Sequence, residues 1–538
     1  MPQAEPKEPP IDESFPLGPG TFALEASNGR WRAFKHLVVV IELLMYLVQG
    51  RFNRLMVFMP PRHGKSWLIS KYFLAWFLGS FPDLRVILAT RDATFSAKWG
   101  RITKQLLEKY GKRLFVKEIG YKDENGELKR IIEPNQVELD KSSNASYRWD
   151  IKDHDGGLFT AGIGTGILGE GAHGLIIDDP SKGFKKVNSK AHQLELNDWF
   201  YTEGTTRLDK DMDTGRNPWI IYIAQRLGTK DLAGQILNGF HDDDPGEPHI
   251  DASEALEILR GGGSIEPGTW VVLNLPALAE ENDILGRSEG EALCPQIKDE
   301  EELRKIQKAM GSFRFEAIYQ GNPREREGKI FKREWFLDER GEILGSILTN
   351  SQKLPDPLNE LRYWDFAASG EEGDNLAATK TGYYQTTRMI EGAAINLNEM
   401  VVRGLLHGKY SSNQVLNRFE KITIKDGKSC KRMVEQEPGS MAKLLITKFR
   451  RNRKLKGYPK IQADKVKDSK LDRSFDLEVM AETGRLLFDT DSLSTSEIKK
   501  IVYELIEFTG EEGGEDNITD TLTGSARHWE RRRRKVKV

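Results

Sequence analysis

Short apolar runs alternate with amphipathic segments through the first half of the chain. The runs RLMVF (residues 54–58), GLIID (174–178) and WIIYIAQRLG (219–228) have the composition of buried strands, and residues 85–111 begin with a fourth β-rich run. After the first run the apolar side chains have helical spacing, at Leu68, Ile69, Phe73, Trp76 and Phe77. Strands that alternate with helices in this way predict an α/β fold with a mainly parallel sheet.

Length and composition indicate a soluble protein of several domains. At 538 residues the chain is too long for one ordinary core, and 38% hydrophobic with 30% charged residues is typical of globular proteins. The longest apolar stretch, LVVVIELLMYLV, is shorter than a membrane span and contains Glu42, so we expect no membrane association. Cys294 and Cys430 are the only cysteines, which excludes a disulfide framework and a cysteine-rich zinc site. The first twenty residues lack the apolar core of a signal peptide, and a cytoplasmic location is expected.

The segment MPPRHGKS, residues 59–66, has the chemistry of a phosphate-binding loop. Gly64 lets the backbone approach phosphate, Lys65 can reach the outer phosphates, and the Ser66 hydroxyl can bind Mg²⁺. Met59 stands where such loops usually begin with glycine, and an ordinary turn is the alternative interpretation. The flanking strand and helix favour the loop. The residues predicted to hold ATP are Pro61, Arg62, His63, Gly64, Lys65 and Ser66.

Polar residues at two later strand ends complete a nucleotide site. Asp178 and Asp179 end the GLIID run, so we predict that Asp178 binds Mg²⁺ with Ser66 and that Asp179 orients the attacking water. An acidic turn that caps the strand is the alternative. Gln225 is predicted to sense the γ-phosphate, or else to be an exposed strand end. Arg62 is a candidate arginine finger or a structural salt-bridge residue.

Carboxylates also follow several apolar runs in the second half. Asp365 follows LRYW, Asp374 opens a plausible neighbouring strand, and Glu435 and Glu437 follow another β-rich run. Asp516 and Asp520 are four residues apart and therefore share one face of a helix that opens there. Such carboxylates suit two Mg²⁺ or Mn²⁺ ions that cleave a phosphodiester. With 82 acidic residues in the chain, a chance arrangement is the alternative.

Basic segments offer contacts for a nucleic acid backbone. The formal net charge of −2 gives no overall sign of nucleic-acid binding, so binding must come from local clusters. The clusters are KFRRNRKLKGYPK (448–460), the group Lys465, Lys467, Lys470 and Arg473, and the terminal RHWERRRRKVKV (527–538). A solvated face or a disordered tail is the alternative interpretation.

The motifs together resemble the large terminase subunits of tailed bacteriophages. MPPRHGKS, GILGEGAHGLIIDDPSKG, AQRLGTKDLAGQIL and FRFEAIYQGNP occur in that family's order, and the family does not require the leading glycine. The resemblance implies a ribonuclease H-like nuclease in the second half, with Asp365, Glu435 and Asp516 as metal ligands and Asp520 in support. At residues 515–517 the chain has Glu-Asp-Asn where the family commonly has His-Asp-Asp.

The resemblance implies a DNA-packaging motor with two active sites. It would use ATP with Mg²⁺ to move double-stranded DNA and two Mg²⁺ or Mn²⁺ ions to cut concatemers. Its implied partners are a small terminase subunit, the portal of the procapsid, and further copies in a ring, with a monomer as the free form. It would act in the host cytoplasm and transiently at the portal. The expected parts are a flexible segment (1–25), an ATPase domain (26–325), a linker (326–358), a nuclease domain (359–530) and a basic tail (531–538).

Two rival hypotheses remain open from the sequence. A P-loop translocase or helicase with an inactive C-terminal DNA-binding domain would keep the ATPase and lack the cutting activity. A non-enzymatic capsid or scaffold adaptor would lack both activities.

Overall fold

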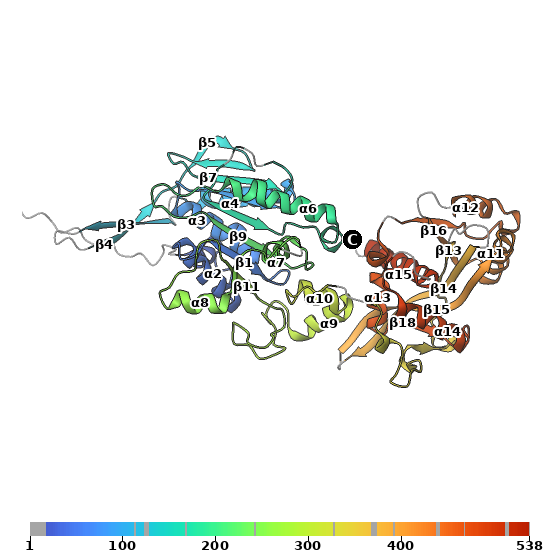
Figure 1. Ribbon diagram of the computed structural model, residues 1–538. Helices are drawn as coiled ribbons and strands as arrows, with labels where there is room; N and C mark the ends of the chain where they lie inside the picture. The colour runs from blue at the N-terminus through green and yellow to red at the C-terminus, as the bar shows by residue number, and fades with distance from the viewer. Residues whose placement is uncertain are drawn as a thin grey trace, which may run out of the picture. The chain divides into compact units, whose positions relative to one another are not determined.

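The chain divides into two compact units. One unit comprises residues 1–306 and 312–325, and the other comprises 307–311 and 326–538. The computed structural model (Figure 1) describes residues 18–111, 115–122, 128–166, 169, 171–241, 244–325, 329–366, 374–390, 393–436, 442–466, 468–511 and 516–536.

A nine-stranded sheet forms the centre of the first unit (Figure 1). Its strands, in spatial order, are β10 (His249–Asp251), β11 (Trp270–Asn274), β1 (Arg54–Phe58), β9 (Trp219–Ala224), β8 (Gly174–Asp178), β2 (Arg85–Thr90), β7 (Gly157–Gly162), β6 (Arg148–Ile151) and β5 (Leu139–Asn144). The seven strands from β10 to β7 pair in parallel, and only β6 and β5 join antiparallel. A separate antiparallel hairpin consists of β3 (Phe115–Lys122) and β4 (Leu128–Asn135). Because parallel strands share a direction, their carboxyl ends all lie at one edge.

Helices bury both faces of this sheet. The helical segments are α1 (Pro19–Ala26), α2 (Lys35–Val48), η1 (Trp67–Phe73), α3 (Leu74–Ser80), α4 (Ala93–Tyr110), α5 (Phe184–Val187), α6 (Lys190–Asp198), η2 (Trp199–Gly204), η3 (Thr205–Arg207), α7 (Leu232–Asn238), α8 (Ala252–Arg260), α9 (Glu300–Met310) and α10 (Ser312–Ile318). Side chains of β1 alternate between two cores, with Leu55 and Val57 in one and Met56 and Phe58 in the other. This alternation follows from the two-residue period of a strand.

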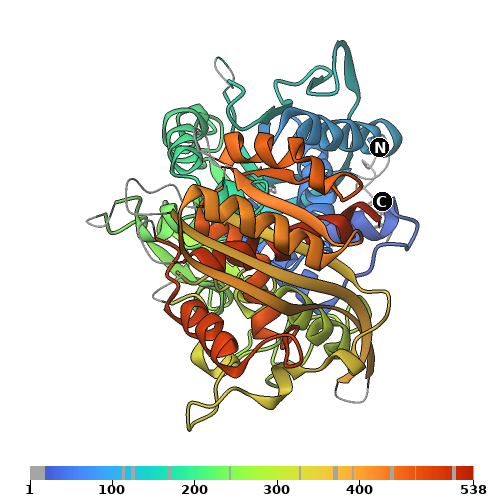
Figure 2. The same ribbon diagram turned by 90° about the vertical axis from the view of Figure 1, so that its right-hand side faces the viewer.

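The second unit contains a seven-stranded mixed sheet. Its spatial order is β12 (Leu348–Thr349), β18 (Leu486–Asp489), β15 (Ala393–Tyr410), β14 (Asp374–Ile390), β13 (Asn359–Phe366), β16 (Lys431–Gln436) and β17 (Gln462–Lys465). The long strands β14 and β15 lie side by side in Figure 2 and pair antiparallel, as do β13 and β14. β16 then pairs parallel with β13, and β17 parallel with β16. This arrangement agrees with the ribonuclease H-like fold expected for this part of the chain.

Helices again cover both faces of the second sheet. They are α11 (Ser412–Asp426), α12 (Ala442–Arg451), α13 (Lys470–Glu482), α14 (Thr495–Glu507) and α15 (Asn517–Val536), and the short turns are η4 (Arg333–Trp335), η5 (Gly345–Ile347), η6 (Ser351–Lys353) and η7 (Arg453–Leu455). Tyr363 of β13 belongs to the core with α13, α14 and α15, whereas its neighbour Trp364 belongs to the core with α11 and α12. Ser494 and Glu497 form a capping box that begins α14.

The predicted α/β class is confirmed, with a mainly parallel sheet in the first unit. Residues 1–17 of the segment expected to be flexible lie outside the described residues, and α1 includes its last part. From the segment expected to be a linker, Ile330, Phe331 and Phe336 are buried in the core of the second unit. Helix α15 continues into the expected basic tail. Within the described residues, no helix is long and apolar enough to cross a membrane.

Close packing of α15 on β13 gives a first testable prediction. A Cβ atom at Gly524 would lie 2.2–2.5 Å from ring atoms of Tyr363. We expect Gly524→Ala to lower the free energy of unfolding of the second unit by about 1–3 kcal/mol, because the ring must move within a filled core. Urea unfolding of the full chain measures this change. The control is Gly345→Ala, since a Cβ there meets nothing within 4 Å. Equal stability of the two variants would contradict the expectation.

Candidate functional sites

The predicted phosphate loop joins β1 to η1, which has π-helical hydrogen bonding. Arg62 and Gly64 have φ angles of +67° and +100°, left-handed backbone conformations of the kind that occur in phosphate-binding loops. Gly64 also accepts a hydrogen bond from the Leu68 N–H at 2.9 Å, which begins the helix. Met59 is 2% exposed and packs in the core. The unusual first residue of the loop therefore has a packing role.

The sheet order brings Asp178 to this loop. β9 pairs with both β1 and β8, and Ile223 is in register with Val57 on one side and Asp178 on the other. The Ser66 hydroxyl donates to Asp178 Oδ1 at 2.9 Å, and the Ser70 hydroxyl donates to Oδ2 at 2.7 Å. Burial, followed by the charge of Asp179, raises the pKa of Asp178 to about 7. Ser70 was not predicted, since its role depends on the helix that follows the loop.

Lys65 and Asp179 form an ion pair at 2.9 Å, and Lys65 is 7% exposed. Asp179 has a φ of +46°, an uncommon conformation for a residue other than glycine, and its N–H donates to Ile223 O at 2.9 Å. This conformation places its carboxylate against the lysine of the loop. The oxygens of Ser66 and Asp178 are the donor types that Mg²⁺ prefers, so the residues present fit a magnesium nucleotide.

Gln225 lies beside Asp179, and its N–H donates to Asp179 Oδ1 at 3.4 Å. Both residues line a cavity of about 10 Å³, which is close to the size of one water molecule. The next residue, Arg226, is instead buried in an ion pair with Asp231 at 3.0 Å. Arg62 is exposed, and among the described residues its side chain forms no ion pair. That position suits contact with a phosphate from outside the loop.

Two buried histidines form hydrogen bonds with the backbone of the loop. His63 Nδ1 is 3.1 Å from Pro61 O, and His36 Nε2 is 2.9 Å from His63 O. Burial lowers the pKa of His36 to about 4 and also lowers the pKa of His63. Both rings are therefore neutral at physiological pH, and they contact the loop at the carbonyl oxygens of Pro61 and His63. His36 was not predicted to contact the loop, because 27 residues separate the two histidines.

The second unit assembles carboxylates at the carboxyl ends of neighbouring strands. β13 and β16 pair up to Trp364 and Val434, so Asp365 and Glu435 directly follow the last paired residues. Glu435 is itself in register with Asp464 of β17. Asp464 was not predicted, since it lies within a polar, basic stretch without a strand signal.

Basic side chains tie these carboxylates to the start of α15. Lys470 Nζ lies 2.6 Å from Asp516 Oδ1 and 3.2 Å from Asp520 Oδ2. Arg473 forms an ion pair with Glu435 and lies 3.7 Å from Asp520 Oδ1. The cluster of Glu435, Asp516, Asp520, Lys470 and Arg473 is called the acid cluster below. Lys470 and Arg473, which the sequence analysis assigned to DNA contacts, are thus engaged within it.

A second set of contacts adjoins the acid cluster. Arg527 forms an ion pair with Asp464, and the Tyr363 hydroxyl donates to Asp464 Oδ2 at 2.8 Å. These contacts keep the end of β17 against α15.

Burial perturbs the carboxylates of the acid cluster. It raises the pKa of Glu435 to about 7 and also raises the pKa of Asp520. Burial alone would lower the pKa of Lys470, but the charges of Asp520 and Asp516 outweigh it and raise that pKa. The ammonium group therefore remains charged between the two aspartates.

The donor chemistry of the acid cluster fits hard divalent cations. Glu435 Oε2 and Asp520 Oδ1 are buried oxygens without a hydrogen-bond partner among the described residues. Carboxylate oxygens are the ligands that Mg²⁺ and Mn²⁺ prefer. The type of ligand therefore fits, but the described side chains do not yet surround a metal position. Across the described part of the chain, no three or more His, Cys, Asp or Glu residues are grouped as they would be around a metal ion. Glu437, Glu515 and the side chain of Asp374 lie outside the described residues.

A comparison with solved structures matched most of this chain, or a shorter part of it, to several proteins. A large terminase from a thermophilic bacteriophage aligns over 92% of this chain and 99% of its own, with 13% identity and a TM-score of 0.43. The bacteriophage HK97 large terminase aligns over 92% and 95%, with 10% identity and a TM-score of 0.29. The nuclease domain of the large terminase subunit of bacterial virus Sf6 aligns over 37% and 98%, with 14% identity and a TM-score of 0.24. No family model and no curated protein matches the sequence.

The buried His36 ring predicts a pH-dependent stability. Its pKa is about 4 in the folded chain against an ordinary value of 6.5, so the unfolded chain binds the proton more strongly between those values. Stability contributed by the neutral ring is complete above pH 6.5 and is lost as the pH falls toward 4. As the pH falls from about 7 to about 5, we expect the contribution of His36 to the free energy of unfolding to decrease by about 2 kcal/mol.

Urea unfolding at those two pH values measures this loss. His36→Gln cannot titrate, so its unfolding midpoint should change less between the two pH values than that of the parent. An equal change in the two proteins would show that His36 carries none of the dependence.

Proposed function

We propose that the chain is the large subunit of a terminase, a motor that packages viral DNA with the energy of ATP. The observation that carries the proposal is the contact of Lys65 and Ser66 with the paired carboxylates of Asp179 and Asp178, across strands that are distant in sequence. In an ordinary glycine-lysine-serine turn, the lysine and the serine would not be expected to contact two successive aspartates at the end of another strand. The left-handed loop and the donor set suit a phosphate-bearing nucleotide.

Residues of the loop and of the neighbouring strand ends would have different roles in ATP hydrolysis. Lys65 would exchange its contact with Asp179 for the outer phosphates, and that exchange would release the Asp179 carboxylate toward the neighbouring cavity. Asp179 and Gln225 line that cavity, where a water molecule could be held for attack. Ser66 and Asp178 would hold Mg²⁺, which when bound neutralises charge on the phosphates. Arg62 would meet the transferred phosphate from the exposed side of the loop.

The second unit would supply a DNA nuclease. Asp365, Glu435 and Asp516, with Asp520 in support, would hold two Mg²⁺ or Mn²⁺ ions, which when bound activate water and stabilise the leaving oxygen. Lys470 and Arg473 now neutralise these carboxylates, and they would turn to the DNA phosphate when the ions take their place. The two unsatisfied buried oxygens of Glu435 and Asp520, identified among the described residues, support this exchange.

The whole assembly would couple these two activities on double-stranded DNA. In this proposal several copies form a ring on the portal of a procapsid, a small terminase subunit recognises the DNA, and the free chain is a monomer. The chain would act in the host cytoplasm and transiently at the portal. The sequence motifs that resemble large terminases, in their family order, support this assignment.

One observation favours a second candidate function. Lys470 and Arg473 pair with the carboxylates of the acid cluster, and such pairing is also what a structural ion-pair network would show. A P-loop DNA translocase whose second unit binds DNA without cutting it is therefore the rival hypothesis. It shares the ATPase and differs only in the nuclease.

DNA-stimulated ATP turnover by the full chain tests the first site. We expect Lys65→Ala to reduce turnover on the order of 100-fold, because the cation that meets the developing phosphate charge is lost. Asp179→Asn should reduce turnover similarly while ATP binding is retained. The exposed neighbour Lys182→Ala is the control and should keep parental turnover. Undiminished turnover in Lys65→Ala would remove the assignment of the loop.

Plasmid cleavage in Mg²⁺ and in Mn²⁺ separates the nuclease from its rival. The parent should cut, and Asp365→Ala and Glu435→Ala should each reduce cutting on the order of 100-fold or more, because each removes an oxygen ligand. Glu342→Ala removes an exposed acid of the same unit that pairs with Lys499 outside the acid cluster, and it should cut like the parent. No cleavage by the parent in either metal, with ATP turnover intact, would favour the translocase.

A further inference from the structure

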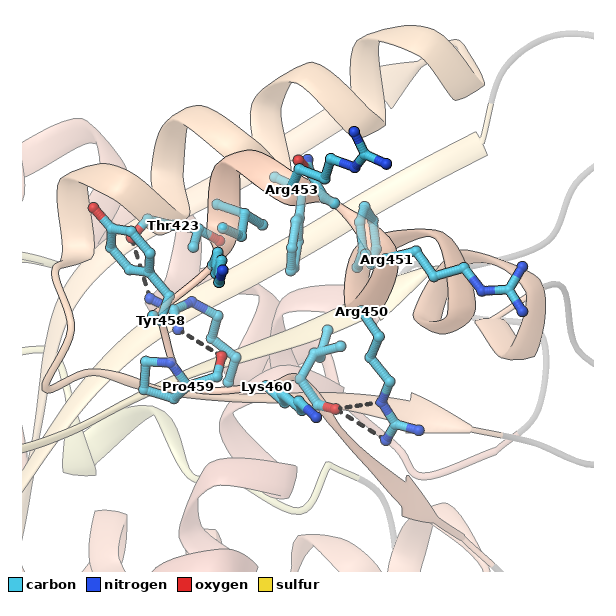
Figure 3. Close-up of a pocket in the computed structure, with 15 residues that line it drawn as sticks. Thr423, Arg450, Arg451, Arg453, Tyr458, Pro459 and Lys460 are labelled. Atoms are coloured by element: carbon cyan, nitrogen blue, oxygen red, sulfur yellow. Dashed lines mark hydrogen bonds between the residues drawn. The ribbon is translucent and has the colours of Figure 1, made fainter.

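A cavity of about 300 Å³ lies in the second unit, between the end of α12 and the start of β17 (Figure 3). Its volume lies at the lower end of the range usual for small-molecule sites. The basic segment 448–460 supplies most of its wall, and Ile461, α11 and β16 supply the remainder. The charge of this segment made it a candidate contact for a DNA backbone, and none of its residues belongs to the acid cluster.

The inner wall of the cavity is apolar and aromatic. Phe419 and Phe449 stack with ring centroids 3.6 Å apart and an interplanar angle of 17°, and they are 1% and 4% exposed. Leu455, the Tyr458 ring and Pro459 continue this surface toward solvent. A flat, apolar ligand group can lie against such a wall without loss of hydrogen bonds.

Arg432 places a buried positive charge in the same wall. It is 2% exposed, and its guanidinium donates to three backbone carbonyls, Pro459 O at 3.0 Å, Thr423 O at 3.1 Å and Gly427 O at 2.9 Å. Its Nε has no hydrogen-bond partner among the described residues. The nearby Asp426 carboxylate is held by Arg362 at 2.8 Å on both oxygens. Carbonyl dipoles orient Arg432 but do not cancel its charge, so its positive charge stabilises an anion near the cavity.

Besides Arg450, which donates to Ile461 O, the rim of the cavity carries four more cations. Arg451, Arg453, Lys456 and Lys460 are exposed, and the guanidinium groups of Arg451 and Arg453 extend outward in Figure 3. Lys454 pairs with Glu420 at 2.9 Å, whereas none of the four rim cations forms an ion pair within the described residues. Positive charges that lie along one rim without ion-pair partners among the described residues can contact successive phosphates of a nucleic acid strand.

We propose that this cavity binds one nucleotide unit of a DNA strand, with the base against the aromatic wall and the flanking phosphates on Arg451 and Arg453. An aromatic surface beside a cationic track is the combination that holds nucleic-acid strands without reading their sequence. The inference rests on the proposed function, because it assumes that DNA is the polymer on which this chain acts.

The cavity is separate from the acid cluster. Arg432 and Glu435 are three residues apart on β16, which corresponds to roughly 10 Å along a strand. An odd separation also directs the two side chains to opposite faces of the sheet. The cavity would therefore hold DNA beside the cutting site without entering it, and changes at its rim should leave the acid cluster intact.

Fluorescence anisotropy of a labelled oligothymidylate of about 12 nucleotides with the full chain tests the proposal. We expect the double variant Arg451→Ala, Arg453→Ala to bind at least about tenfold more weakly than the parent at low salt. The slope of log affinity against log salt should also fall by about one to two. Tyr458→Ala should weaken binding about fivefold or more, while Tyr458→Phe should bind like the parent because it keeps the ring.

The matched control is Lys332→Ala, Arg340→Ala, which removes the same charge from exposed positions of the same unit. Equal binding by the parent and the Arg451/Arg453 variant, or an equal loss in the control, would overturn the proposal. DNA-stimulated ATP turnover of the same proteins is measured in parallel. If the parent shows this turnover but the oligonucleotide result is negative, the cavity assignment fails and the proposed function stands.

Competition with dTMP separates a strand from a free nucleotide. We expect dTMP to displace the oligonucleotide only at millimolar concentration, because a single nucleotide reaches fewer rim cations than a strand does. Displacement at micromolar dTMP would overturn the assignment to DNA and identify a site for free nucleotides.

Discussion

Parallel pairing is the constraint on which both candidate sites depend. When strands run in one direction, their carboxyl ends meet at one edge, and the residues that follow them become neighbours whatever their separation in sequence. Ser66 and Asp178 are 112 residues apart and meet at 2.9 Å because β9 pairs with both β1 and β8. In the second unit, the parallel register of β13, β16 and β17 places Asp365, Glu435 and Asp464 at one edge in the same way.

Buried charge is the second theme common to the two units. At the loop, Lys65 balances Asp179 while two serine hydroxyls stabilise Asp178. In the acid cluster, Lys470 and Arg473 balance the carboxylates that would hold metal ions. A buried ion pair is weak evidence for stability, because desolvation opposes the attraction between its members. It is a good starting point for a site in which a ligand replaces one partner, since the charges are already partly desolvated and oriented.

The basic segment 448–460 shows how the tertiary structure changes the meaning of a charge run. Sequence alone allows a solvated face or a DNA contact. The fold leaves Arg451 and Arg453 exposed at the rim of a cavity, while Arg450 donates to Ile461 O at 3.1 Å and stabilises the backbone. Residues with the same charge in one segment therefore have different roles. The aromatic wall comes from Phe419 and Phe449, which lie on different helices and have no common sequence signal.

The sequence by itself determined the α/β class, the strand, loop and helix around residues 59–66, and the acids at strand ends, because apolar period and turn chemistry are local properties. It also indicated Asp178 and Glu435, since each follows a recognisable apolar run. Only the tertiary structure decided that Ser70, His36 and Asp464 belong to the sites. Their contacts cross 108, 27 and 101 residues to Asp178, His63 and Tyr363, and no local pattern encodes such distances. The packing of the second unit likewise decided which cations neutralise the acids. Lys470 and Arg473 resemble other basic residues in the sequence, but they lie on α13, which packs against the start of α15 and the end of β16.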